Sequence, residues 1–125
     1  MRSTIRRFLL VLTGLVFAGI AIASLAAPDA MAAKLGYQLA STDARSEYFA
    51  IYVGLWLAHA AVCFLAARHI AEARLGDVVG LLVLGQVVGR AVAVALDGEL
   101  PSAKILPFAI LEAAGAIAIL AVRPR

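Results

Sequence analysis

The sequence predicts an all-α protein: a four-helix transmembrane bundle in a single integral membrane domain, residues 1–125, with both termini cytoplasmic. Three observations support this. The chain is 64% hydrophobic and 15% charged, whereas a soluble domain is nearer ~50% apolar. It has apolar stretches of about the 20 residues that cross a bilayer, and arginines flank alternate ends of these stretches. The predicted spans are residues 8–27, 46–67, 78–97 and 105–122.

The first predicted span presents a stripe of small residues on which another helix can pack closely: Gly14, Ala18, Gly19 and Ala23. Basic residues before this span and small residues after it also fit a cleaved signal peptide. Its apolar run is longer than the about 7–15 residues of a typical signal core. We therefore expect the segment to be retained as a span.

The connection after the first span contains apolar residues at every fourth position, at Met31, Leu35 and Leu39. This spacing predicts a short helix at the membrane interface. Three consecutive capping residues then predict that the second spanning helix begins near Ala44: Ser41, Thr42 and Asp43. Helical spacing predicts an inward face on that helix: Tyr48, Tyr52, Leu55, His59, with Trp56 and Cys63 beside it.

The third and fourth spans contain helix-boundary and packing signals. Asp77 is a favourable cap for the third helix, and Gly98 provides a left-handed stop. Gly85 and Gly89 form a small-xxx-small pair, which predicts close packing within the chain. Pro107 predicts a kink in the fourth helix because it lacks a backbone N–H.

The arginine distribution predicts the orientation. Membrane proteins keep an excess of Lys and Arg in cytoplasmic loops, and most arginines here lie before the first span, between the second and third, and after the fourth: Arg2, Arg6, Arg7, Arg68, Arg74, Arg123 and Arg125. We interpret them as topology signals. They are not interleaved with aromatics, so nucleic acid is not an expected partner.

Arg90 and Glu112 each lie inside an otherwise apolar span. A charge at a helix centre costs roughly 2.5–3.5 kcal/mol on insertion scales. Each charge is seven residues from the outer end of its span, about 10 Å deep, so we expect an ion pair. Glu47, Tyr48 and Tyr52 are expected near the same level. Two readings stay open: a structural interhelical clamp, or a polar pocket that binds a head group or moves a proton.

Other chemistry has little support in the sequence. It contains no phosphate-binding loop, dinucleotide fingerprint, Cys-x-x-Cys pair or nucleophile elbow. His59 and Cys63 are one turn apart, but without a third or fourth ligand they do not predict a metal site. We expect no metal and no cofactor. The single cysteine excludes an intrachain disulfide.

Two segments carry a family resemblance. Residues 47–58 read EYFAIYVGLWLA, and Gly89-Arg90 precedes Asp97-Gly98-x-x-Pro101 and then Glu112. The chain resembles the domain-of-unknown-function 4345 family of small bacterial four-span membrane proteins. The resemblance implies the fold, no agreed activity, and these signature positions: Glu47, Tyr52, Arg90, Asp97 and Glu112.

We therefore expect a multi-pass protein of the bacterial inner (cytoplasmic) membrane whose biochemical activity is unknown. The favoured function is noncatalytic: binding or supporting another membrane component through small-residue helix faces. The alternative is a small carrier or lipid-acting enzyme that uses Arg90 and Glu112 on a lipophilic substrate with a polar head. The expected partners are the lipid bilayer and either another membrane protein or a lipophilic small molecule. The candidate site is a polar cluster: Glu47, Tyr48, Tyr52, Arg90, Asp97 and Glu112.

Overall fold

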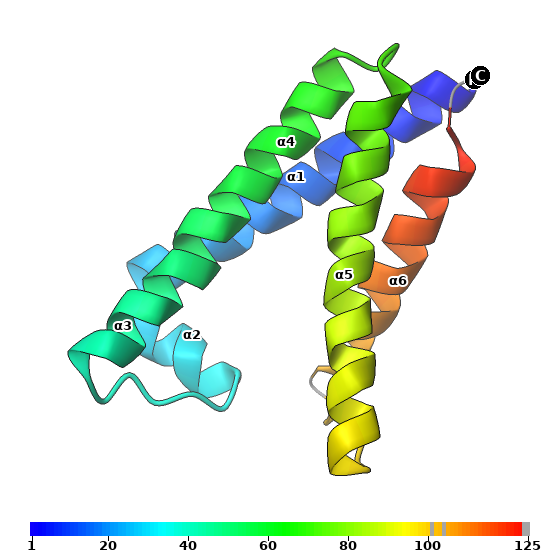
Figure 1. Cartoon of the computed structure of the whole chain (residues 1–125). Helices are drawn as coiled ribbons and strands as arrows, with labels where there is room; N and C mark the ends of the chain where they lie inside the picture. Colours follow the sequence, from blue (N-terminus) through cyan, green and yellow to red (C-terminus); the bar gives the residue numbers. More distant parts are fainter. Residues whose placement is uncertain (101, 104, 124–125) are drawn as a thin grey trace.

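Three long apolar helices dominate the computed structural model, which describes residues 1–100, 102–103 and 105–123 (Figure 1). They are α1 (Arg2–Ala26), a continuous helix over residues 42–68, and α5 (Ala73–Asp97). Each is long and apolar enough to cross a membrane. The described residues include no strand, so the all-α prediction is confirmed.

The helix over residues 42–68 consists of three segments: α3 (Thr42–Phe49), the π-helical η1 (Ala50–Leu55) and α4 (Trp56–Arg68). Its start agrees with the sequence prediction, because the Ser41 hydroxyl accepts a hydrogen bond from the Ala44 backbone N–H at 3.0 Å. The π-helical segment was not predicted. Such wider turns are rare and occur frequently at functional sites.

The last helix, α6 (Leu106–Ala121), is shorter than the other long helices. Its 16 residues extend about 24 Å, against about 30 Å for a hydrocarbon core. Pro107 lies in its first turn, where the backbone N–H has no partner within the helix. The predicted kink is therefore wrong. Pro101 lies outside the described residues.

The sequence predicted where α5 begins and where it ends, and only the predicted end is confirmed. Gly98 ends the helix with a φ of 72°, in the left-handed region, as predicted. The predicted start is wrong, because Glu72 occupies the cap position and Asp77 lies inside the helix. A carboxylate at Asp77 has a different role here: it pairs with two arginines from other parts of the chain.

The connection between α1 and α3 contains the short helix α2 (Pro28–Lys34). A short helix was predicted here, but its position differs. It begins at Pro28, a residue whose fixed φ suits the first helical turn, and it ends before Leu35. Gly36 follows with a φ of 84°, so the four-residue apolar spacing that extends to Leu39 is not helical throughout.

The helices pack as two antiparallel hairpins, α1 against α4 and α5 against α6 (Figure 1). Small residues allow close approach within each hairpin: a Cβ at Gly14 would lie 2.9 Å from the Phe64 ring, and one at Gly80 would lie 2.7 Å from Leu120. The two hairpins lie close together where α4 ends and α5 begins, and they diverge toward α3 and the end of α5. The shared core includes residues from every long helix: Leu10, Phe17, Cys63, Val79, Val83, Ala116 and Ile119.

Gly85 and Gly89 do not pack as predicted. A Cβ added at either position meets no atom of the described part of the chain within 4 Å. The close contacts of α5 instead involve Gly76, which faces Arg6, and Gly80, which faces Leu120. The small-xxx-small pair therefore leaves an open strip on α5.

Candidate functional site

Arg90 and Glu112 form the expected ion pair between α5 and α6. The Arg90 Nε and Nη2 atoms each donate to one Glu112 carboxylate oxygen, both at 2.9 Å. This two-bond geometry is the strongest form of an Arg–carboxylate contact. The Arg90 side chain is 32% exposed and that of Glu112 is 15% exposed, so the pair lies partly inside the protein with the arginine on the more open side.

A pocket of about 370 Å³ lies beside this pair, between the helix over residues 42–68 and α5. Its volume is within the range of small-molecule sites, about 300–1,000 Å³. One wall of the pocket comes from α5: Leu82, Gly85, Gln86 and Arg90. The opposite wall comes from η1 and α4: Ile51, Tyr52, Leu55, Trp56 and His59. One wall thus carries hydrogen-bond donors and the other carries aromatic rings.

The aromatic wall is continuous. The rings of Tyr48 and Tyr52 stack with centroids 4.9 Å apart, and the Tyr52 and Trp56 centroids are 5.9 Å apart. Phe17 of α1 supports this row from behind through an edge contact with Trp56 at 5.4 Å. The Tyr52 hydroxyl also donates a hydrogen bond to the Tyr37 hydroxyl at 3.2 Å. These contacts hold the rings in place around the pocket.

The π-helical segment explains why the rings line up. In an α-helix, residues four apart advance about 40° around the axis, so a row of rings at every fourth position drifts away from one face. A π turn contains more residues than an α turn, so the same spacing drifts in the opposite direction. The change from α3 to η1 keeps Tyr48, Tyr52 and Trp56 on one side of the helix.

Only part of the predicted polar cluster comes together here. Tyr52 and Arg90 line the pocket, and Glu112 pairs with Arg90. Tyr48 is buried and supports the aromatic row. Glu47 and Asp97 are exposed, and no hydrogen bond or ion pair of either side chain appears among the described residues.

The candidate cluster omitted three polar or aromatic residues that line the pocket: Trp56, His59 and Gln86. The sequence did contain signals for them. His59 falls at the helical spacing of Tyr52 and Leu55, and Gln86 is four residues before Arg90 on the same helix. Pairing this face of the second helix with the Arg90 face of the third would have identified both walls.

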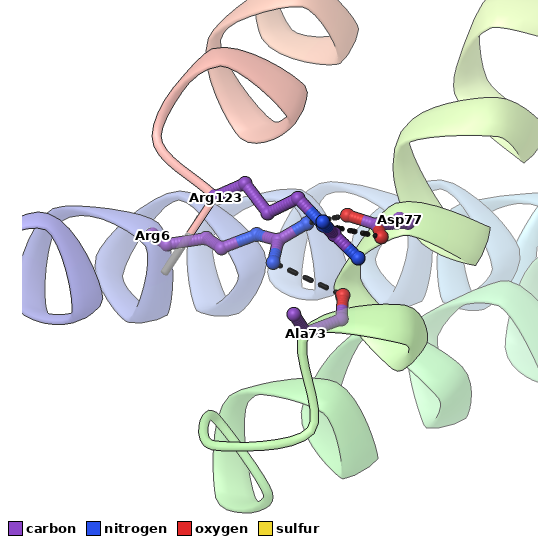
Figure 2. Close-up of polar contacts among 4 residues, drawn as sticks. All are labelled: Arg6, Ala73, Asp77 and Arg123. Atoms are coloured by element: carbon purple, nitrogen blue, oxygen red, sulfur yellow. Dashed lines mark hydrogen bonds and ion pairs between the residues drawn. The ribbon is translucent and has the colours of Figure 1, made fainter. Parts of the chain in front are cut away.

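A second polar cluster joins the hairpins at the opposite end of α5, and Figure 2 shows its four residues. Arg6 of α1 donates to the Ala73 carbonyl oxygen at 3.0 Å and to the Asp77 carboxylate, and Arg123 donates to the other Asp77 oxygen at 2.8 Å. Asp77 and Arg90 are thirteen positions apart, about 20 Å along the helix. These ion pairs thus join the two hairpins near the start of α5, and the pocket lies toward the opposite end, where the hairpins diverge.

This Arg6–Asp77–Arg123 cluster was not predicted. The arginines were interpreted only as topology signals, and Asp77 was interpreted only as a cap. Arg6 is 1% exposed, and an arginine is almost never fully buried unless it is paired. The sequence alone did not reveal this buried contact, because its residues come from the beginning, middle and end of the chain.

The described residues contain no group of three or more His, Cys, Asp or Glu side chains arranged to hold a metal ion. Cys63 is a free, buried thiol in the core between the helices. The His59 Nδ1 atom is 2.8 Å from the Leu55 carbonyl oxygen in its own helix. The groups that line the pocket are hydrogen-bonding side chains and aromatic rings.

A family model described as a domain of unknown function (DUF4345) matches residues 5–122, nearly the whole chain. Both walls of the pocket and the Arg90–Glu112 pair lie within the matched segment. No curated protein and no solved structure matches the chain.

Proposed function

The chain belongs to the DUF4345 family, whose description names no activity, and we propose that it is a noncatalytic membrane protein that binds a lipophilic molecule in the pocket between α4 and α5. The observation that carries this proposal is the composition of the two walls. Tyr52 and Trp56 offer ring faces to an apolar body, and Arg90 and Gln86 offer donors to a polar head. Sites for small molecules typically combine mostly apolar walls with a few convergent polar groups.

The membrane setting supports a lipophilic ligand. The three candidate spans carry large exposed apolar side chains along their length, among them Leu15, Leu65 and Leu81. We propose that α6 with its flanking residues is the fourth span, since it packs along α5, and that the arginine-rich end is cytoplasmic. A ligand would then reach the pocket from the bilayer. The bacterial inner membrane is the proposed location.

Retention of the first span is part of the proposal. Arg6, Leu10 and Phe17 of α1 are buried against the other helices, and Phe17 supports the pocket ring of Trp56. Cleavage near Ala27 would remove these contacts. The test is the intact mass of the purified protein: we expect it to include residues 1–27, and a mature start near Ala27 would contradict this arrangement.

A second candidate function has a specific observation in its favour. The strip at Gly85 and Gly89 is open, and small-residue strips allow membrane helices to approach one another closely. A partner helix could dock there, which is the support function expected from the sequence. The carrier or lipid-acting enzyme alternative would use the same pocket and would also require the Arg90–Glu112 pair.

The test is native mass spectrometry of the protein released from its own membrane with surrounding lipid. Gly85→Leu and Gly89→Leu are a matched pair, because both positions are open on α5 but only Gly85 lines the pocket. We expect a bound small molecule that is lost in Gly85→Leu and retained in Gly89→Leu.

Other outcomes are equally informative. A protein partner at fixed stoichiometry that is lost in both variants would favour the support function instead. A small molecule retained equally in both variants would show that it is not held in this pocket. Either result would contradict the proposed binding function.

A further inference from the structure

The charge of Arg90 is already matched within the protein. Its Nε and Nη2 atoms both donate to Glu112, so one guanidinium and one carboxylate together present no net charge to the pocket. Among the described residues, the hydrogen bonds of this side chain involve these two nitrogens only. An arginine has five N–H donors, which leaves three for a ligand: the two N–H groups of Nη1 and one of Nη2.

An anionic head group finds no net positive charge here, because Glu112 already neutralises Arg90, and it could pair fully with Arg90 only by displacing Glu112. Drawing Arg90 away would leave a carboxylate that is only 15% exposed without its partner, and an unpaired buried charge is strongly unfavourable. A neutral acceptor faces no such competition. Its oxygen can accept from Nη1 or from the Gln86 amide while both bonds to Glu112 stay in place.

The opposite wall adds no fixed positive charge that would favour an anion. The Leu55 carbonyl oxygen can only accept, so the His59 Nδ1 atom beside it acts as the donor. In the neutral ring Nε2 is then an acceptor, which offers no hydrogen bond to an anionic oxygen. The remaining lining from this wall is apolar or aromatic: Ile51, Tyr52, Leu55 and Trp56. Among the described residues, no lysine or arginine lines the pocket on this side.

We infer that the pocket selects a lipophile whose polar end is an uncharged hydrogen-bond acceptor, such as an ester or other carbonyl-like oxygen, over one with an anionic head. The inference rests on the proposed binding function and names its ligand class. The Arg90–Glu112 pair then determines specificity: the arginine supplies hydrogen-bond donors, and the glutamate neutralises the charge that would attract anions.

Trp56 provides the readout, because it is the single tryptophan of the chain and it lines the pocket. The probes are a dibromoalkyl phosphate and its dimethyl ester, since bromine quenches indole fluorescence on contact. The two probes differ in charge but share a chain and a phosphoryl acceptor. Each is titrated into the full-length protein in bilayer nanodiscs, and the quenching seen in Gly85→Leu is subtracted as the contribution of bulk lipid.

We expect the dimethyl ester to bind at least about tenfold more tightly than the phosphate in the unmodified protein. We expect Glu112→Gln to reverse this preference, because Arg90 then carries an uncancelled charge into the pocket. The comparison in the unmodified protein does not depend on the folding of any variant.

Two results would overturn the inference, and they can be told apart. Saturable binding in which the phosphate equals or exceeds the ester would refute the preference for a neutral head while leaving the pocket as a binding site. No saturable quenching by either probe would refute both the inference and the proposed function. A folded Glu112→Gln variant with an unchanged preference would also refute the role assigned to the pair.

Discussion

Asp77→Asn should destabilise the protein far more than its exposure suggests. Asp77 accepts hydrogen bonds from Arg6 and Arg123, and Arg6 is 1% exposed while Asp77 is 23% exposed. The substitution keeps the size of the side chain but removes the charge that balances Arg6. The other hydrogen bond of Arg6 among the described residues goes to the Ala73 carbonyl, and its Nε atom is buried without a partner.

The expected loss follows from these contacts. Breaking a buried ion pair by removing one partner costs about 3–5 kcal/mol because the other charge stays buried. Since Asp77 is partly exposed, water can replace some of the lost interaction. We therefore expect a loss near the lower end of that range, about 3 kcal/mol in free energy of unfolding.

The matched control is Asp29→Asn. Asp29 also accepts two hydrogen bonds from an arginine, Arg45, at 3.0 and 3.1 Å. Those side chains are 70% and 41% exposed, and exposed pairs contribute about 0–1 kcal/mol. Both substitutions replace an arginine-paired carboxylate with an amide, so their difference measures the effect of burial together with that of the second arginine at Asp77.

The assay is unfolding of the purified protein in mixed micelles of rising SDS content, monitored by Trp56 fluorescence and helical circular dichroism. Arg6→Gln combined with Asp77→Asn should recover most of the lost stability, because no buried charge is left unpaired. Arg123 also loses its partner, but it is 56% exposed and water can solvate it. The reasoning fails if Asp77→Asn costs no more than Asp29→Asn, or if the double variant is as unstable as the sum of the single variants.

Three further predictions concern the packing, the charge pair and the topology. Gly80→Ala should lower the free energy of unfolding by about 1–3 kcal/mol, because its Cβ would lie 2.7 Å from Leu120. Gly89→Ala should be neutral or should stabilise the protein by up to about 1 kcal/mol. SDS unfolding compares the two variants, and equal effects would contradict the contact assignment. Glu112→Gln should lower the free energy of unfolding by about 2–3 kcal/mol, and the added change Arg90→Gln should restore most of this loss. The predicted role of the ion pair is refuted if the double variant recovers neither its membrane abundance nor its unfolding midpoint. A periplasm-active reporter should be active when inserted at Gly36 and inactive when fused after the last residue; activity at the C-terminal fusion would contradict four spans with cytoplasmic termini.

The sequence was sufficient to predict the features that depend on local signals. The long apolar helices, the Ser41 cap and the left-handed Gly98 stop follow from composition and from residue types at helix ends. The Arg90–Glu112 contact was also predictable, because two charges at matching depth on adjacent helices have few other partners in a membrane.

Features that depend on distant parts of the chain were missed. Asp77 is a favourable cap by type, but the buried guanidinium of Arg6 recruits it into the helix interior. The Gly85 and Gly89 strip looked like a packing surface, and only the placement of α6 along the Gly80 face shows that it is open. The π-helical segment has no clear local signal, although it aligns Tyr48, Tyr52 and Trp56.

The most direct test of the central claim is a crystal structure of the full-length protein grown from a lipidic cubic phase seeded with its native lipid extract. We expect density for an elongated molecule between the Trp56 ring and the Arg90 guanidinium, with its polar atom near Nη1 and both Arg90–Glu112 bonds retained. A structure in which α4 and α5 close on each other and their own side chains fill the roughly 370 Å³ pocket would contradict it.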